Sequence, residues 1–188
     1  MTLSMVQAIP QTVVGAESRR QRFSALAREH YQPVYCFIAR QVSNKADVAD
    51  ITQQIFVKGF RSFERFDLDR SFAPWIFTIA RRCLVDFFRS HRPQNEQIHD
   101  SIIDPGSNPR EETVKKDNAD QLWELASRLK PQQHQVLLLH YKENFTMQET
   151  ARIMGITKTH AKVLVFRART ALKKRIENSP NVAGGMDR

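Results

Sequence analysis

The chain has 188 residues, a length that suits one or two small domains. Its 29 Lys and Arg outnumber its 20 Asp and Glu, and the resulting net charge of +9 favours a polyanionic partner and salt-sensitive binding. No run reaches the roughly 18–20 apolar residues of a membrane span, and the N-terminus does not read as a secretion signal, so we expect a cytoplasmic protein without membrane insertion.

The first half of the chain predicts a helical domain over residues 18–92. Residues 1–17 are polar and show no period, so we expect them to be disordered. Apolar residues then recur at helical spacing over three stretches. The first runs from Phe23 to Ile38, as one helix or as two short helices broken near Pro33. The other two run from Asp47 to Phe63 and from Phe72 to His91.

A linker is predicted over residues 93–112. This stretch holds three prolines and a glycine and loses the helical period. Five carboxylates against one arginine give residues 94–112 a net charge of −4, inside a chain that is +9. The segment therefore reads as a flexible acidic linker between two small domains. Its acidic composition does not by itself imply a binding role, because a plain solvated spacer explains it equally well.

The second predicted domain, residues 113–176, holds four helices with a helix-turn-helix, and residues 177–188 read as a flexible tail. The helices are expected at 113–128, 132–142, 146–154 and 157–176. Ala151 is small enough for two helices to cross closely. Gly155, four residues later, suits a turn that needs positive φ. The fold class is therefore all-α.

The last of these helices carries Lys and Arg and, before Glu177, no carboxylate. Such a helix fits the major groove of DNA, where its first turns read bases and its basic residues hold phosphates. An amphipathic hairpin with a solvated basic face is the alternative interpretation. Thr157 is the expected N-cap, while His160 either contacts DNA or caps the helix.

No pattern in the sequence supports catalysis. It has no Gly-rich phosphate loop and no metal-binding spacing of Cys or His, so we expect no enzyme activity, cofactor or metal. Cys36 and Cys83 lie in apolar helical settings and read as small buried hydrophobes.

Four stretches together give the chain a specific resemblance to bacterial sigma factors of the extracytoplasmic-function group in the sigma-70 family. They are YQPVYCFIARQVSNKADVADITQQIFVKGF, FAPWIFTIARRCLVDFFRSHRP, LKPQQHQVLLLHYKENFTMQETARIMGI and the basic helix after it. The resemblance covers roughly residues 20–176. It implies a transcription initiation factor that binds core RNA polymerase, recognises the −35 promoter element and melts the −10 element.

The resemblance implies a role for each part of the first domain. One set of residues matches the motif that docks on the β′ clamp helices of RNA polymerase: Asp47, Asp50, Gln53, Gln54 and Phe56. Asp47 and Asp50 also suit a helix N-terminus through its dipole. Another set matches the part that binds the −10 element: Phe66, Asp67, Asp69, Ser71, Arg81, Arg82, Arg89 and Arg92. Residues 66–71 would capture a flipped base, or form a plain surface turn.

In the second domain the resemblance assigns −35 recognition to the start of the basic helix. The residues are Thr157, Lys158, Thr159, His160, Lys162, Val163 and Arg167. This chain departs from the family pattern in having Arg82 where Asn is frequent, and in having His160, Lys162 and Leu164 where Thr, Lys and Arg are common. The preferred −35 sequence is therefore expected to differ.

The implied partners are core RNA polymerase, through its β′ and β subunits, promoter DNA and an anti-sigma factor. A stand-alone dimeric helix-turn-helix regulator is the alternative. Such a protein would bind a palindrome tightly by itself, whereas a sigma factor would bind promoters usefully only with core polymerase. A receiver domain or a ligand pocket is not visible in residues 18–92.

Overall fold

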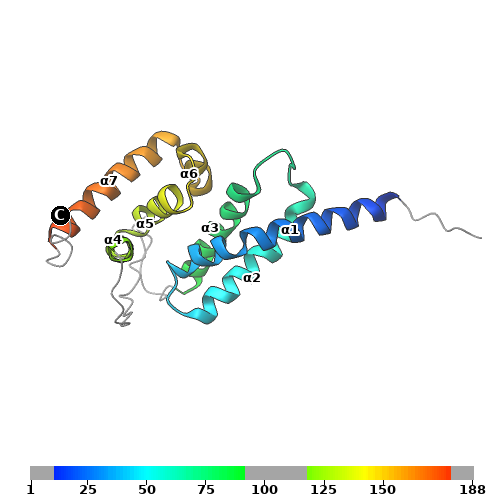
Figure 1. Cartoon of the computed structure of the whole chain (residues 1–188), viewed down its shortest axis with the longest axis horizontal. Coiled ribbons are helices and arrows are strands. Elements are labelled where there is room, and N and C mark those ends of the chain that lie inside the picture. The colour runs from blue at the N-terminus through cyan, green and yellow to red at the C-terminus, as the bar shows by residue number, and fades with distance from the viewer. Residues whose placement is uncertain (1–10, 92–117, 179–188) are drawn as a thin grey trace, which may run out of the picture.

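The computed structural model describes residues 11–91 and 118–178, and side chains within 18–91 and 119–178. All regular structure in these two ranges is helical, as predicted. The first range forms one helical domain and the second forms another, and the two lie side by side (Figure 1). The predicted linker and the C-terminal tail beyond residue 178 lie outside the described residues.

The first helix, α1 (Gln11–Ala39), is longer than the sequence predicts. It begins at Gln11, so the expectation that all of residues 1–17 are disordered is wrong for 11–17. It also continues through Pro33, although proline removes a backbone hydrogen bond. Val34, Phe37 and Ile38 just beyond the proline are completely buried, and this packing holds the helix together where local propensity would break it.

The next elements complete a three-helix domain. α2 (Lys45–Ser62) starts at Asn44, whose side-chain oxygen accepts a hydrogen bond from the backbone N–H of Ala46 at 2.9 Å. A short 3₁₀ turn, η1 (Phe63–Arg65), and a loop lead into α3 (Phe72–Ser90). α2 packs closely on its neighbours at Gly59, where an added Cβ would lie 3.0 Å from Cδ1 of Ile76.

The second domain holds α4 (Asn118–Ser127), α5 (Pro131–Leu137), η2 (Leu138–Lys142), α6 (Met147–Met154) and α7 (Lys158–Glu177). The α5 helix runs into η2, a π-helical turn in which the N–H of Glu143 bonds to the carbonyl of Leu138. The sequence predicted an unbroken α-helix over 132–142, and the π-helical turn over Leu138–Lys142 departs from that prediction.

The helix-turn-helix formed by α6 and α7 is fixed by local signals. Thr146 and Glu149 form a capping box at the start of α6. Gly155 ends α6 with φ of 65°, in the left-handed region, as predicted. Ala151 is buried, and Thr157 caps α7 by accepting a hydrogen bond from the N–H of His160 at 3.1 Å. The geometry therefore settles the N-cap on Thr157 and leaves the His160 side chain exposed.

The two domains touch through α3 and α6. The rings of Phe77 on α3 and Phe145 just before α6 meet edge to face, with centroids 5.0 Å apart. Arg40, at the end of α1, lies close enough to His134 and Glu143 of the second domain to lower the pKa of each, although burial is the larger influence on both. Burial lowers the pKa of His134 to about 4 and raises that of Glu143.

Candidate polymerase and nucleic-acid interfaces

The predicted polymerase-binding residues lie along α2. Asp50, Gln53 and Gln54 are exposed, while Asp47 in the first turn is half-buried. The opposite side of α2 enters the core through Val48, Ile51 and Ile55. The helix therefore presents one carboxylate and two amides to a partner, with a second carboxylate near its N-terminal end.

Phe56 does not stand alone on this surface. Its ring stacks on that of Tyr31 from α1, with centroids 5.6 Å apart. The Tyr31 ring also stacks on that of Tyr35, with centroids 6.3 Å apart. Tyr31 is 46% exposed and Phe56 is half-buried. Sequence reasoning missed Tyr31 because it belongs to a different helix, and only the packing of α1 on α2 brings the two rings together.

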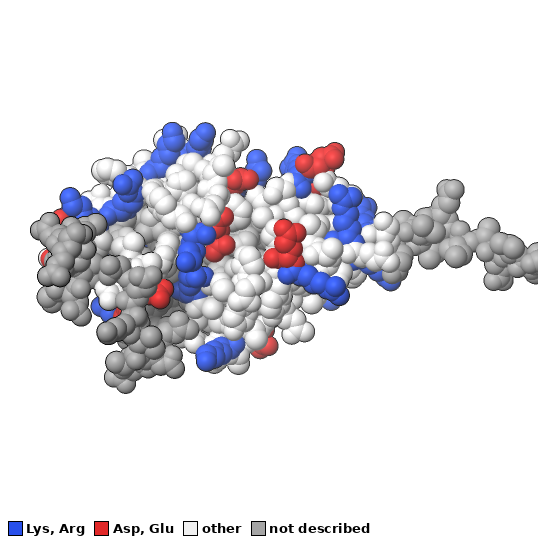
Figure 2. All heavy atoms as spheres, in the orientation of Figure 1, with Lys and Arg blue, Asp and Glu red and all other residues white. Residues whose placement is uncertain are grey.

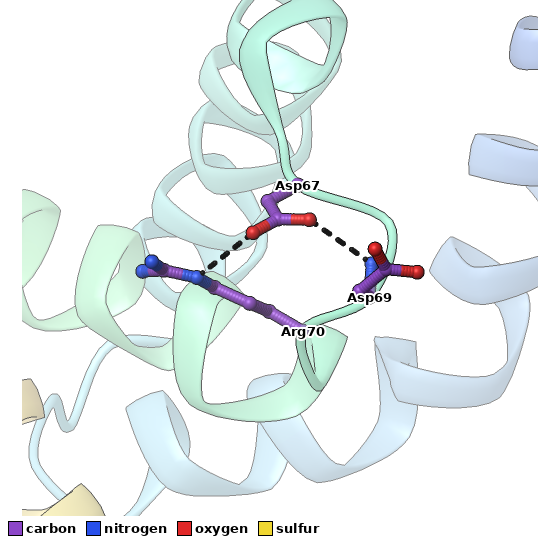
Figure 3. Close-up of polar contacts among 3 residues, drawn as sticks. All are labelled: Asp67, Asp69 and Arg70. Atoms are coloured by element: carbon purple, nitrogen blue, oxygen red, sulfur yellow. Dashed lines mark hydrogen bonds and ion pairs between the residues drawn. The ribbon is translucent and has the colours of Figure 1, made fainter.

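The loop between η1 and α3 is held by its own polar groups (Figure 3). The Asp67 carboxylate accepts a hydrogen bond from the backbone N–H of Asp69 at 3.2 Å and from Nε of Arg70 at 3.1 Å. The Arg70 N–H also bonds to the carbonyl of Asp67. Ser71 is exposed and makes no side-chain capping bond to α3, so its hydroxyl can turn to a ligand.

Phe66 is buried, although it belongs to the set that the sequence predicts to bind the −10 element. Its side chain is only 6% exposed and lies in an aromatic cluster, 4.7 Å from the ring of Trp75 and 5.5 Å from that of Phe63. In this structure the ring cannot pack on the face of an extruded base. It supports the loop from beneath, and this leaves Asp67, Asp69 and Ser71 as the exposed groups of the predicted base-binding set.

The predicted −10 arginines on α3 are placed unequally. Arg82 and Arg89 are exposed, whereas Arg81 is half-buried and its Nε has no hydrogen-bond partner among the described residues. Burial, with the neighbouring charge of Arg82, lowers the pKa of the Arg81 guanidinium. Arg92 lies outside the described residues. Phe77 is buried in the hydrophobic core, and Trp75, Ile79, Phe87 and Phe88 are half-buried and pack against it.

The predicted −35 residues share one end of α7. The exposed residues of this set, counting the N-cap, are Thr157, Lys158, Thr159, His160, Lys162, Val163 and Arg167. Four residues anchor the opposite side of the helix in the domain: Ala161, Leu164, Val165 and Ala168. Figure 2 shows Lys and Arg gathered along α7 at the upper left, with few carboxylates beside them.

Phe166 also lies on the exposed side of α7, and sequence reasoning missed it. Its side chain is 71% exposed, although it is a large apolar residue. It lies three and four residues after Val163 and Lys162, so the three share one helix face. Its position four residues after Lys162 could have indicated that Phe166 is exposed. A phenylalanine in an amphipathic helix is, however, first expected to belong to the core.

The described residues contain no group of three or more His, Cys, Asp or Glu that could hold a metal ion, and none of their helices is long and apolar enough to cross a membrane. Cys83 is buried and Cys36 half-buried, and both are free thiols.

The two domains match two protein-family models. Residues 26–94 match sigma-70 region 2, and residues 119–172 match sigma-70 region 4. These ranges contain α2, the 66–71 loop and α3 in the first domain, and the helix-turn-helix in the second. The geometry and the two matches define a promoter-recognition protein of two helical domains.

Curated relatives and solved structures agree with these matches. The sigma factor BldN of Streptomyces coelicolor is 29% identical over 78% of this chain and 57% of its own length, and SigX of Bacillus subtilis is 23% identical over 84% of each. RpoE of Bartonella quintana, solved with the anti-sigma factor NepR, has the same fold at a TM-score of 0.65 and 18% identity, over 89% of this chain and 99% of that one. The chain belongs to the sigma-70 family of RNA polymerase sigma factors, in its extracytoplasmic-function group. Members of this family are non-enzymatic factors that direct RNA polymerase to promoters.

Proposed function

We propose that this sigma factor reads the −35 element with α7, opens the −10 element with the 66–71 loop and α3, and docks on the β′ clamp helices through α2. The observation that carries the proposal is the α7 surface. This helix has a defined N-cap, a turn fixed by Gly155 and an exposed face that is basic and free of carboxylates up to Glu177. That combination supports a recognition helix in which base-reading residues come first and phosphate-binding residues a turn later.

The docking assignment rests on the exposed polar side of α2. Asp50, Gln53 and Gln54 present acceptors and donors to a basic helical partner, and the Tyr31–Phe56 stack adds apolar area beside them. Such a mixture of a rigid aromatic pair and exposed polar groups is typical of a specific protein interface.

Charge reversal on α2 tests this assignment. Asp50→Lys, alone and with Asp47→Lys, should weaken binding to core polymerase by about tenfold or more, because like charges then face the basic partner surface. Affinity is measured by competition against the wild-type chain, with Asp86→Lys on α3 as a control for charge. An unchanged affinity for core would refute the docking surface while leaving the family assignment intact.

Transcription in vitro with purified core polymerase is the experiment that tests the function as a whole. The chain should direct core polymerase to a subset of promoters and should bind those promoters weakly without it. The alternative, a stand-alone dimeric regulator, predicts tight binding to a palindrome by the chain alone. Family membership favours the first outcome.

Two further proposals complete this picture. The solved neighbour RpoE was captured with the anti-sigma factor NepR, and CnrH with the cytosolic domain of CnrY, and we expect this chain to be held by an anti-sigma factor. Because its polymerase partner is cytoplasmic, we expect the chain to act in the cytoplasm, without catalysis or a cofactor of its own.

A further inference from the structure

One end of the first domain carries arginines that the proposed sites do not use. The start of α1, the end of α2 and the η1 turn meet there, beside the 66–71 loop (Figure 1). Phe23 of α1 joins these elements, because its ring lies 5.4 Å from that of Phe60 and 5.1 Å from that of Phe63. Along the chain, five arginines lie within about one helical turn of these rings: Arg19, Arg20, Arg22, Arg61 and Arg65. We call these arginines, together with Phe60, the α1–α2 patch.

The positive charge of the α1–α2 patch is largely unneutralised. All of its arginines except Arg19 are exposed, and none of them forms an ion pair with a carboxylate of the described residues. Glu64 is the only carboxylate among residues 18–23 and 60–66, and Asp67 in the adjoining loop is already paired with Arg70. Figure 2 shows Lys and Arg side chains gathered beside the start of α1. Such a one-signed surface favours a polyanion as its partner.

Arg19 adds a hydrogen-bond donor that lacks an acceptor. Its side chain is half-buried, and its Nε is shielded from solvent without a hydrogen-bond partner among the described residues. An unpaired buried donor costs free energy. A turn of this side chain toward a phosphate oxygen would satisfy the donor and pair the charge at the same time.

An exposed aromatic ring lies among these charges. Phe60 is 46% exposed, although its ring meets that of Phe23 edge to face. A basic surface that also offers an aromatic ring is typical of proteins that bind single-stranded nucleic acid, because bases stack on the ring while arginines hold phosphates. A duplex offers no free base face, since its bases stack on one another. The combination therefore indicates a single strand.

The α1–α2 patch adjoins the proposed −10 pocket. Arg65 immediately precedes Phe66, the first residue of the 66–71 loop. Phe23 also contacts Phe72, the first residue of α3 after this loop, with ring centroids 6.0 Å apart. A strand with one base held by the loop would therefore bring its neighbouring nucleotides to the patch.

We propose that the α1–α2 patch binds single-stranded DNA, namely the stretch of the opened promoter strand that flanks the base held by the 66–71 loop. Its arginines hold phosphates, and Phe60 stacks on a base. Three of the five arginines precede residue 26, where the match to sigma-70 region 2 begins, so the patch extends the DNA surface beyond that region. The placement on the promoter strand rests on the proposed function, whereas the affinity for single strands does not.

Binding to a plain single strand tests the site without a promoter or polymerase. The full chain is titrated against fluorescent oligo(dT) and against a duplex of equal length, over a range of salt concentrations. Arg22→Gln with Arg65→Gln should weaken oligo(dT) binding on the order of tenfold and lower the salt slope by about 1.4, because two phosphate contacts are lost. Lys45→Gln with Lys130→Gln, which removes the same charge from exposed positions elsewhere, should cost less than about twofold.

Phe60→Leu separates base stacking from charge. Leucine keeps apolar contact with Phe23 but has no ring face, so oligo(dT) binding should fall about fivefold or more while the salt slope and the duplex affinity stay the same. Circular dichroism confirms that each variant is folded.

Three results would overturn the site. The arginine pair could prove no weaker than the control pair, or Phe60→Leu could lose duplex and oligo(dT) affinity alike. The patch variants could also lose binding to poly-glutamate while keeping that to oligo(dT), which would make the partner an acidic protein.

Holoenzyme assembled with core polymerase then tests the placement of the strand. On a promoter with a pre-melted −10 element, Arg22→Gln with Arg65→Gln should again weaken binding on the order of tenfold. Trimming the single strand on one side of the −10 element should remove this difference from wild type, and trimming the other side should retain it. A difference that survives both trims would reject the placement and keep the single-strand site. If the holoenzyme selects no promoters, the proposed function fails, and the oligo(dT) result still decides the site.

Discussion

Phe66 and Phe166 show how differently the two DNA-binding regions are built. Phe66 begins the 66–71 loop of the first domain, directly after η1, and is buried in an aromatic cluster, so this loop depends on packing among η1, α3 and their rings. Phe166 projects from a helix whose start and preceding turn are set by Thr157 and Gly155, and most of its side chain is exposed. The proposed −35 surface is therefore a local structure presented to solvent, whereas the proposed −10 surface depends on tertiary packing.

The sharpest test of this contrast is the same substitution at both positions. Phe66→Ala should lower the free energy of unfolding by about 3–5 kcal/mol, because it empties a buried aromatic site. Phe166→Ala should change stability by less than about 0.5 kcal/mol, yet weaken −35 binding by about 1–2 kcal/mol through lost apolar contact. Urea unfolding and DNA binding are measured for both. If Phe66→Ala left stability unchanged but altered the preferred −10 base, the Phe66 ring would contact a base of the −10 element directly.

Lowering the pH should destabilise the folded chain through His134, a buried residue of the second domain near Arg40 of the first. The pKa of His134 in the folded chain is about 4, below the ordinary value of 6.5, so its folded form stays neutral while the unfolded chain takes up a proton. Stability from this group is complete above pH 6.5 and is lost as pH falls toward 4, by up to about 3 kcal/mol. Thermal unfolding between pH 7 and 4.5 measures the loss. His134→Gln should flatten the profile, and an unchanged slope would contradict the burial.

Within α7, two basic residues should behave differently. Lys162→Ala is expected to cost about 1–3 kcal/mol on the preferred −35 sequence and to relax the preference, since it lies early enough to reach bases. Arg167→Ala should weaken all sequences alike and lower the salt slope by about one, as for a lost phosphate contact. Binding isotherms over a range of salt on a set of −35 variants check both. A larger change of preference for Arg167→Ala would reverse the assigned orientation of the helix.

The smallest expected effect compares the two helix starts. Thr157→Ala removes a capping hydrogen bond and should cost about 1 kcal/mol of stability. Ser71→Ala removes no capping bond and should be within about 0.5 kcal/mol of wild type. Chemical unfolding of the two single variants measures both changes in the free energy of unfolding. Equal losses would mean that the Ser71 side chain caps α3 in solution.

The sequence predicted the features that depend on neighbouring residues. The all-α class, the turn at Gly155 and the cap at Thr157 all follow from spacing and residue type, and the structure confirms them. It missed the helix at 11–17 and left open whether one helix continues through Pro33, where Val34, Phe37 and Ile38 of the same helix are buried. It could not predict that Phe66 is buried and Phe166 exposed, because a residue's type does not reveal which helix faces surround it. The contact of Phe77 with Phe145 joins distant segments and leaves no local pattern.

The π-helical turn η2 adds a consequence in terms of chain register. Glu143 bonds back to Leu138 and Phe145 to Leu139, so the backbone takes a wider turn than an α-helix before it reaches the Phe145 ring. Each residue of an α-helix rotates the next side chain by about 100°. One residue fewer in this turn would thus swing Phe145 away from the first domain while every side chain in the interface kept its identity. Insertion or deletion, rather than substitution, is the simplest change by which related chains could gain or lose this contact.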